Sequence, residues 1–366
     1  MNPVGSRRQS AAAVVLALGL GAAPEALADD KPFVEGRIVF RLDGEEIYRS
    51  DDPDEETRDI YPRINSDLTF HLGHGFEFFN VLDFKEYEDL DPGEKRYFSD
   101  LGLVVEELGL RYRGDGWMVQ AGKLHPVFGL AYDDAPGLFG DDFPKDYELE
   151  EMWGAGFALE VPLGSPLLGD ATLSGSVFMT DRTILAGSAF AEREVDKIED
   201  GGAANTEYPE SFVLALDGGD GSLTPGFGYQ LGFIHRAAGE GDEGTELGFV
   251  LAVTQKTELD EDWGLFMIAE AAHFEDYEGS LDDVSFGTLG AELSWQGFYL
   301  SGTVAGIIVD ADEGDGYVDH LLTFDFGHEW RIGASRISAE VAWQAYEEEG
   351  LSSEGYGFRL RYRLPI

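Results

Sequence analysis

Cysteine is absent from this 366-residue chain. Without thiols there can be no disulfides, no thiolate zinc sites and no cysteine nucleophile. Basic residues are also scarce, with 25 Lys and Arg against 72 Asp and Glu, so the formal net charge is -47. Nucleic acid needs a basic surface, and this charge therefore excludes it as a partner. The same charge disfavours docking on an anionic lipid surface.

Common catalytic motifs are missing as well. The chain contains no G-x-S-x-G and no G-x-x-x-x-G-K-[ST], and its seven histidines never form H-E-x-x-H. Barrel lipases can use a Ser and a His on the outer wall, but His320 and His328 have no serine on their own expected strand. The acidic run at 310–316 misses the spacing of a calcium loop by one residue, which indicates an ordinary turn. We predict no enzyme, no cofactor and no metal site.

A single apolar run of some length stands at the amino terminus. Arg7 and Arg8 precede the apolar residues 11–23, and Ala26-Leu27-Ala28 places small residues where a signal peptidase needs them. The run is too short to remain as a spanning helix. We expect residues 1–28 to be a cleaved signal peptide for export through the inner membrane, with residues 29–366 forming the mature protein.

The whole chain is 43% hydrophobic and 13% aromatic, so the part after residue 28 is not a disordered acidic tail. Its apolar and polar residues alternate with period two, which is typical of strands whose two faces meet different media. One example places Val34, Ile38, Phe40 and Leu42 on one face and Glu35, Arg37, Arg41 and Asp43 on the other. About sixteen such runs occur, each with roughly the length of a tilted membrane strand.

The connections between these runs favour a membrane barrel over a soluble sandwich. Connections after even-numbered runs are mostly short, whereas those after odd-numbered runs are mostly longer and acidic, as in outer-membrane barrels. Four tryptophans stand beside the short turns, where an interfacial girdle would lie, namely Trp117, Trp263, Trp295 and Trp330. Hydrocarbon offers no partners to unpaired backbone groups, so such a chain can cross only as a closed barrel. We predict an all-β fold, a transmembrane antiparallel β-barrel of about 16 strands in the cell outer membrane.

The last run ends at the last residue of the chain. Its two faces carry Tyr356, Phe358, Leu360, Tyr362, Leu364 and Ile366 on one side and Gly357, Arg359, Arg361 and Arg363 on the other. This run resembles the carboxy-terminal signal of Gram-negative outer-membrane porins, although that family usually ends in Phe and here Ile366 follows Pro365. The GKLHPVF segment at 122–128 is similar to a strand motif of phosphate-selective and related porins. The resemblance implies insertion by the barrel-assembly machinery and a homotrimer.

The stretch from 122 to 151 is dense in Asp, Glu, Gly and Pro and follows the fifth run, so it would be the third outer loop. Phe139, Phe143 and Tyr147 give it apolar anchors that a mobile linker would lack. We expect it to fold into the barrel and narrow the pore, as the resemblance to general porins implies. The phase of residues 117–128 also predicts a bulge near Gly122, and Val104 is expected on the same face as Leu108.

The charges expected at the constriction come from this loop and from the facing wall. The loop supplies Asp133, Asp134, Asp141, Asp142, Asp146 and Glu148. The wall supplies Arg37, Arg41, Arg111, Arg113, Lys123, Arg359, Arg361 and Arg363. Fixed charges in a narrow wet channel determine which ions pass, and opposed signs create a transverse field.

We therefore predict a porin for passive diffusion of small hydrophilic solutes and ions, with weak cation selectivity. Acidic outer loops could also bind divalent cations that bridge to lipopolysaccharide beside the outer-membrane lipid. Two alternatives stay open. One is a substrate-specific porin for an anion or a sugar, and the other is a non-conducting surface barrel for adhesion. Single-channel conductance separates the three.

Overall fold

The computed structural model describes residues 32–86, 90, 93–191, 193 and 195–366. The expected signal peptide, residues 1–28, lies outside the described residues. Within the described part of the chain, no helix is long and apolar enough to cross a membrane.

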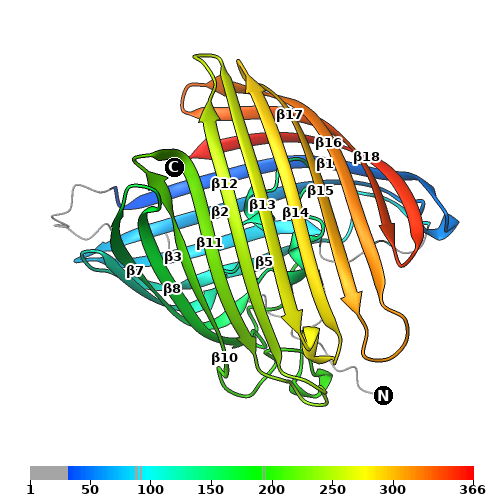
Figure 1. The fold of residues 1–366 in the computed structure, drawn as a ribbon, viewed down its shortest axis with the longest axis horizontal. Helices are drawn as coiled ribbons and strands as arrows, with labels where there is room; N and C mark the ends of the chain where they lie inside the picture. Colours follow the sequence, from blue (N-terminus) through cyan, green and yellow to red (C-terminus); the bar gives the residue numbers. More distant parts are fainter. Residues whose placement is uncertain (1–31, 87–89, 91–92, 192, 194) are drawn as a thin grey trace, which may run out of the picture.

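Sixteen long strands form one closed antiparallel barrel (Figure 1). In chain order they are β1 Val34–Ser50, β2 Arg58–Gly73, β3 Phe76–Glu86, β5 Leu101–Arg113, β6 Trp117–Leu124, β7 Met152–Ser165, β8 Gly169–Thr180, β10 Ser211–Gly221, β11 Thr224–Arg236, β12 Glu246–Glu258, β13 Trp263–Glu275, β14 Asp283–Trp295, β15 Phe298–Asp310, β16 Tyr317–Ile332, β17 Ser335–Glu348 and β18 Leu351–Pro365. Each strand pairs with the next, and β1 pairs with β18, where Phe40 stands opposite Tyr362. The predicted fold class and strand number are confirmed.

Shorter elements lie in the connections. Strand β4 (Lys95–Tyr97) pairs in parallel with the start of β2, and β9 (Ser188–Ala189) pairs with β5. The helical turns are η2 Pro53–Glu55, α1 Ala131–Asp134, η3 Pro144–Tyr147, η4 Ile198–Asp200 and η5 Tyr277–Gly279. The connection 181–210 is thus mainly a loop, as its Gly and Pro residues indicate.

The two faces of the wall differ as the alternation predicts. Outward-facing Leu251, Leu289 and Phe324 are exposed, while inward-facing Gln230 and Thr303 on neighbouring strands are buried. At the end with short turns, such as 74–75 and 296–297, the four predicted girdle tryptophans are exposed. Two of them, Trp263 and Trp295, stack at a ring distance of 5.8 Å. The opposite end carries the long connections 87–100, 125–151 and 181–210, although β17 and β18 join there through only two residues.

Two predictions of strand phase are wrong. Strand β6 pairs with β5 and β7 without a register shift, so no bulge lies near Gly122. The bulge is on β5, because Val81 pairs with Glu107 while Leu82 pairs with Val105, which leaves Glu106 as the extra residue. An extra residue reverses the phase of the strand beyond it. Val104 therefore faces inward beside Asp83 and is fully buried, not outward with Leu108.

Candidate functional site

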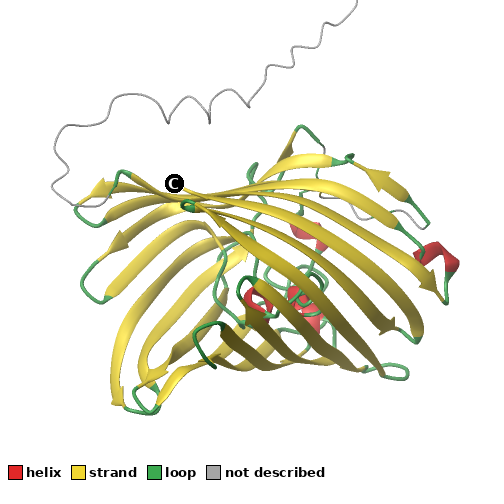
Figure 2. Ribbon diagram, turned by 90° about the horizontal axis from the view of Figure 1, so that it is seen from above, coloured by secondary structure: helices red, strands yellow, loops and turns green. Residues whose placement is uncertain are grey.

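The third outer loop, residues 125–151, folds into the barrel, as predicted. Its helical turns α1 and η3 lie within the ring of strands (Figure 2). All three expected anchors are buried: Phe139 is 2% exposed, Phe143 4% and Tyr147 3%. Fully burying one such side chain stabilises a structure by about 1.5–3 kcal/mol. The loop is therefore packed in place as part of the core.

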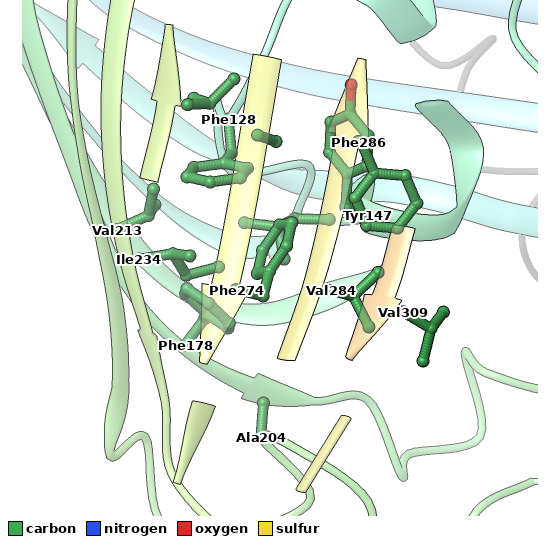
Figure 3. Close-up of a cluster of buried hydrophobic side chains, with 13 residues drawn as sticks. Phe128, Tyr147, Phe178, Ala204, Val213, Ile234, Phe274, Val284, Phe286 and Val309 are labelled. Carbon is green, nitrogen blue, oxygen red and sulfur yellow. The ribbon is translucent and has the colours of Figure 1, made fainter. Parts of the chain in front are cut away.

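Three apolar contacts hold the loop against the inner wall. The largest is an aromatic cluster in which Phe128 and Tyr147 of the loop meet Phe274 of β13 and Phe286 of β14 (Figure 3). Farther along, Leu138 and Phe139 pack on Ala342 of β17. The third contact joins the loop's remaining anchor to β15 and β16, and its residues are Phe143, Ala305 and Leu321.

Polar side chains of the wall fix the loop backbone at the same places. The Glu270 carboxylate on β13 accepts hydrogen bonds from the backbone N–H of Leu130 at 2.5 Å and of Ala131 at 3.2 Å, and from the Tyr147 hydroxyl at 2.5 Å. One carboxylate thus joins both ends of the inward segment. Hydrogen bonds to a charged acceptor are stronger than neutral ones.

Two further strands hold the middle of the loop. Asp325 on β16 accepts a hydrogen bond from the Leu138 N–H at 2.6 Å. The Thr303 hydroxyl on β15 donates to the Pro136 carbonyl at 2.8 Å. Together with Glu270, these residues place the loop along the β13–β18 side of the lumen.

The loop carboxyl groups titrate differently from free acids. Burial raises the pKa of Asp142 to about 8, and the neighbouring Asp141 adds to the effect. Burial and the nearby Asp133 carboxylate raise the pKa of Glu148 to about 9. The pKa of Asp141 is also raised by burial, but the guanidinium groups of Arg359 and Arg41 oppose that shift.

The wall next to the loop attachments, at β18, β1 and β2, carries a row of arginines. Arg41 on β1 stands in register with Arg361 on β18 and with Arg63 on β2. Their neighbours include carboxylates that neutralise part of this charge: Asp43 is fully buried and accepts hydrogen bonds from Arg41 and Arg359, each at 2.9 Å. Further ion pairs are Arg63–Asp83, Arg361–Glu340 at 3.8 Å and Arg37–Asp67 at 3.5 Å.

Only part of the expected set of charges comes together. Among the loop acids, Asp141 has wall arginines, Arg359 and Arg41, as electrostatic neighbours. Burial and Asp133 raise the pKa of Asp134, and burial and Glu278 raise that of Asp146. Elsewhere, Arg111 and Arg113 pair with Glu77 at 3.8 and 2.9 Å near a short turn. Arg363 continues the arginine row along β18.

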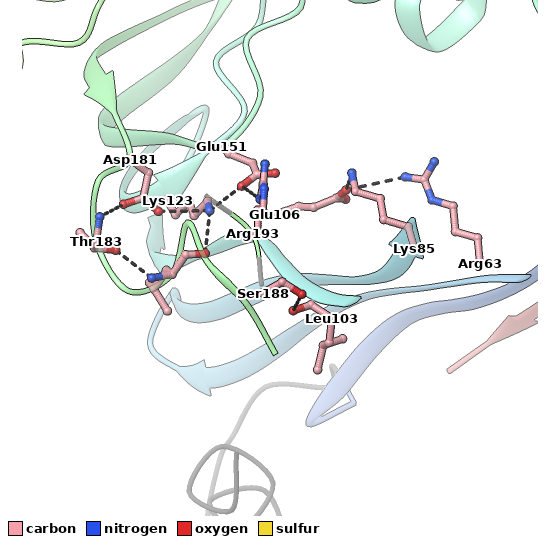
Figure 4. Close-up of polar contacts among 11 residues, drawn as sticks. Arg63, Lys85, Leu103, Glu106, Lys123, Glu151, Asp181, Thr183, Ser188 and Arg193 are labelled. Atoms are coloured by element: carbon pink, nitrogen blue, oxygen red, sulfur yellow. Dashed lines mark hydrogen bonds and ion pairs between the residues drawn. The ribbon is translucent and has the colours of Figure 1, made fainter. Parts of the chain in front are cut away.

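Lys123 does not line the lumen. It shares the phase of the exposed Trp117 and Val119, and yet its side chain is fully buried. Its ammonium group is 2.8 Å from Glu151 and 3.1 Å from Asp181, and it donates to the Leu185 carbonyl at 3.0 Å (Figure 4). The chain leaves the wall two residues later, and β9 pairs with the part of β5 that β6 leaves uncovered. Lys123 therefore joins two loops at this gap.

A cavity of about 660 Å³ lies at the long-loop end between the inward loop and β14–β18. Its charged lining consists of Glu55, Asp146, Glu278, Asp282, Asp319, Glu348 and Glu349, and no Lys or Arg of the described chain lines it. Three tyrosines line it as well, Tyr277, Tyr317 and Tyr346. A pocket that combines carboxylates with aromatic rings attracts cations.

The outer wall carries one Ser–His contact that inspection of single strands could not find. His273 Nδ1 on β13 lies 2.9 Å from Ser285 Oγ on β14. Within the described residues, no carboxylate hydrogen bonds to this histidine to orient it, as a catalytic triad would require. No group of three or more His, Cys, Asp or Glu side chains in the described chain is arranged to hold a metal ion.

Sequence reasoning missed the residues that position the loop. Of these residues, Glu270 is the one that the sequence marks as unusual, because it interrupts the apolar face formed by Phe266 and Ile268. Gln230, Thr303 and Asp325 are not marked in this way, since polar residues are expected on every inward face. Their partners lie between 101 and 187 positions away in the chain.

Known structures share this barrel. The chain resembles OprB of Pseudomonas putida with a TM-score of 0.60 and 10% identity, over 90% of this chain and 94% of that one. It resembles the outer membrane channel DcaP of Acinetobacter baumannii at 0.55 and 11%, over 90% and 97%. For an anion-selective porin from Comamonas acidovorans the values are 0.52 and 10%, over 91% and 98%. No family model and no curated protein matches the sequence. These likenesses show that the chain has the fold of outer-membrane porins.

Proposed function

We propose that this protein is an outer-membrane porin, a water-filled channel through which small hydrophilic solutes and ions diffuse passively. The observation that carries the proposal is the inner wall at β1, β2 and β18, where charged side chains stand in a row behind an apolar outer surface. Charges are costly to place in hydrocarbon or in a dry core. A wet passage beside this wall accounts for them.

The inward loop would form the constriction. It is packed on one side of the lumen, so the remaining passage would run between its acidic turn at Asp141 and Asp142 and the arginines of β1 and β18. A passage with opposed charges on its two sides carries a transverse field that orients dipolar solutes. The sixteen-strand size and the porin-type fold support a channel with this layout.

Weak cation selectivity is part of the proposal. The wall arginines are largely paired with carboxylates, whereas the described lining of the 660 Å³ cavity at the mouth contains acidic residues and no Lys or Arg. The mouth would therefore concentrate cations ahead of a nearly neutral constriction. A substrate-specific porin for anions is the second candidate, favoured by the row of Arg63, Arg41 and Arg361.

Conductance in planar lipid bilayers tests both candidates, the weakly cation-selective porin and the substrate-specific porin. We expect ohmic single-channel currents and, under a potassium chloride gradient, a reversal potential that indicates a small preference for potassium. A clear chloride preference would contradict the cation selectivity, and currents blocked by a phosphate or a sugar would favour the second candidate. No current from folded protein would contradict the channel and leave the surface barrel.

Several further properties belong to the same proposal. Export through the inner membrane by a cleaved signal peptide, insertion by the barrel-assembly machinery and assembly as a homotrimer would follow from a porin identity. Contacts of the acidic outer loops with lipopolysaccharide through divalent cations would follow from their charge. Mass spectrometry of the protein extracted from outer membranes would test both the cleavage after Ala28 and the oligomeric state.

A further inference from the structure

A second cavity, of about 480 Å³, opens at the long-loop end of the lumen beside β1, β2 and β3. Among the described residues, its charged lining is balanced, unlike that of the 660 Å³ cavity. Four acidic residues line it, Glu45, Glu46, Asp59 and Glu86, together with four basic ones, Arg63, Lys85, Arg96 and Arg193. A solute that carries both signs of charge suits such a lining better than a simple cation or anion does.

Two carboxylates of this cavity have an unused oxygen. Arg96 donates to Asp59 Oδ2 at 2.6 Å and to Glu86 Oε2 at 3.2 Å. The other oxygens, Asp59 Oδ1 and Glu86 Oε1, are buried and have no hydrogen-bond partner. Asp59 is only 5% exposed, and the side chain of Glu86 9%. The two carboxyl groups are also electrostatic neighbours, and they lie close enough to hydrogen bond to each other when one of them is protonated.

Buried carboxylate oxygens without donors are costly, so a donor from outside the chain would be bound favourably. An ammonium group is well suited, because it is positive and carries three N–H donors. It could reach both of these oxygens and would take the place of the proton that the two carboxyl groups can share.

The basic residues of the cavity keep donors for a second group. Lys85 Nζ is 2.7 Å from Glu106, and Arg193 Nη1 is 2.8 Å from Glu151 (Figure 4). Arg63 uses Nε and Nη2 on Asp83. Since an ammonium has three donors and a guanidinium five, each residue can still bind a carboxylate oxygen.

We propose that this cavity binds small zwitterionic solutes of the amino-acid type. Their ammonium group contacts Asp59 Oδ1 and Glu86 Oε1, and their carboxylate contacts the cluster of Arg63, Lys85 and Arg193. A cavity of this size has room for an amino acid or a dipeptide, since a water molecule takes about 30 Å³ in the liquid. The inference rests on the proposed function, because it places the site at the mouth of the proposed channel.

Isothermal titration calorimetry on the purified full-length protein in detergent tests the site, with L-glutamine as the probe. We expect binding of one equivalent, and a dissociation constant about tenfold higher in Glu86→Gln, which keeps an acceptor for Arg96 but places an amide N–H₂ where the ammonium would bind. Asp59→Asn is the second variant, with the same expectation. Glu348→Gln, which removes the same charge from the 660 Å³ cavity, is the matched control and should bind as the parent protein does.

Two modified probes test both ends of the solute. N-acetyl-L-glutamine lacks the ammonium and L-glutaminamide lacks the carboxylate, so both should bind about tenfold more weakly than L-glutamine. Absence of binding, equal affinity in Glu86→Gln and Glu348→Gln, or equal affinity for L-glutaminamide would overturn the inference. Bilayer conductance is measured separately: a conducting protein that binds no glutamine refutes only this site, and a binding protein that does not conduct refutes only the channel.

Discussion

The two halves of the inner wall differ in the chemistry of their inward side chains. Along β1, β2 and β18 the inward side chains are ionic, with Arg41, Asp43 and Arg359 in direct contact. Along β11–β14 the inward side chains include an apolar cluster toward the long-loop end, in which Ile234, Phe274 and Phe286 are almost fully buried. A water-filled barrel with an apolar inner surface would lose that surface's favourable burial. The inward loop covers this apolar cluster.

This difference explains why the loop lies where it does. Its aromatic residues need apolar partners, which the strands from β8 to β17 supply, and Glu270 and Asp325 supply acceptors for its backbone on the same side. Asp141 of its acidic turn then has Arg359 and Arg41 as electrostatic neighbours. The position of the proposed constriction is thus set by the distribution of apolar residues on the opposite wall.

Removal of Glu270 should have the largest effect on the difference between the two halves of the inner wall. Glu270→Ala leaves the N–H groups of Leu130 and Ala131 and the Tyr147 hydroxyl without their acceptor, and each buried unsatisfied group costs about 1–3 kcal/mol. We expect the loop to leave the wall more often, with larger and noisier single-channel currents. Cleavage by a lysine-specific protease reports the same release, because Lys145 is the sole Lys or Arg between residues 125 and 151.

Glu292 provides the matched control for this experiment. It is an inward acidic residue of the adjacent strand β14, and no hydrogen bond joins its side chain to the loop in the described structure. Glu292→Ala should therefore leave cleavage at Lys145 unchanged. Equal cleavage rates in the two variants would show that the Glu270 contacts do not hold the loop.

On the ionic half, Asp43→Asn should have the next largest effect. Asp43 is fully buried between Arg41 and Arg359, and loss of one partner of a buried ion pair costs about 3–5 kcal/mol. It also leaves the arginine row with one more uncompensated positive charge. We expect a lower thermal unfolding midpoint by circular dichroism and a reversal potential shifted toward chloride.

Asp67→Asn is the control on the same half of the wall. Asp67 pairs with Arg37 at 3.5 Å, and both side chains are about half exposed. Exposed pairs contribute about 0–1 kcal/mol, so stability should hardly change. A selectivity shift as large as that of Asp43→Asn would show that the buried arginine row is not what sets selectivity.

Sequence alone predicted the features of this fold that depend on the order of residues within a single strand or loop. Alternation gives the faces, as for Phe40 and Arg41, and composition gives the loop and its anchors Phe139, Phe143 and Tyr147. The order of residues within one strand does not reveal its register with the neighbouring strands. Asp43 meets Arg359 across the barrel closure, 316 positions later, and no local pattern indicates which charges will pair.

The wrong predictions for Val104 and Lys123 have the same origin, because both positions depend on contacts with distant parts of the chain. The bulge at Glu106 changes the face of Val104 because of how β5 pairs with β3, a fact absent from β5 itself. The sequence pattern placed Lys123 in the lumen, although Lys123 lies on the same face of its strand as the apolar residues Trp117 and Val119. Its ammonium group is instead bound by Asp181 and the Leu185 carbonyl, which lie in a loop that only the folded chain brings to it.

A change of pH should have the smallest effect on the contrast between the two halves of the inner wall, and it acts in part through two carboxyl groups of the loop. Asp142 and Glu148 have pKa values of about 8 and about 9, raised from ordinary values of 3.8 and 4.5 mainly by burial. Both carboxyls are therefore largely protonated at neutral pH. An acid with a raised pKa in the folded state contributes stability below its ordinary pKa, and that contribution is lost as pH rises through 8 and 9.

Raising the pH from about 6 to about 10 should thus add negative charge to the loop and loosen it, while the arginines of the facing wall stay charged. We expect the reversal potential to move a few millivolts toward greater potassium preference, together with faster cleavage at Lys145. In the double variant Asp142→Asn, Glu148→Gln both changes should be nearly absent, since neither side chain can ionise. If the double variant responds to pH as the parent protein does, the titrating charge lies elsewhere on the channel wall and the loop is not its source.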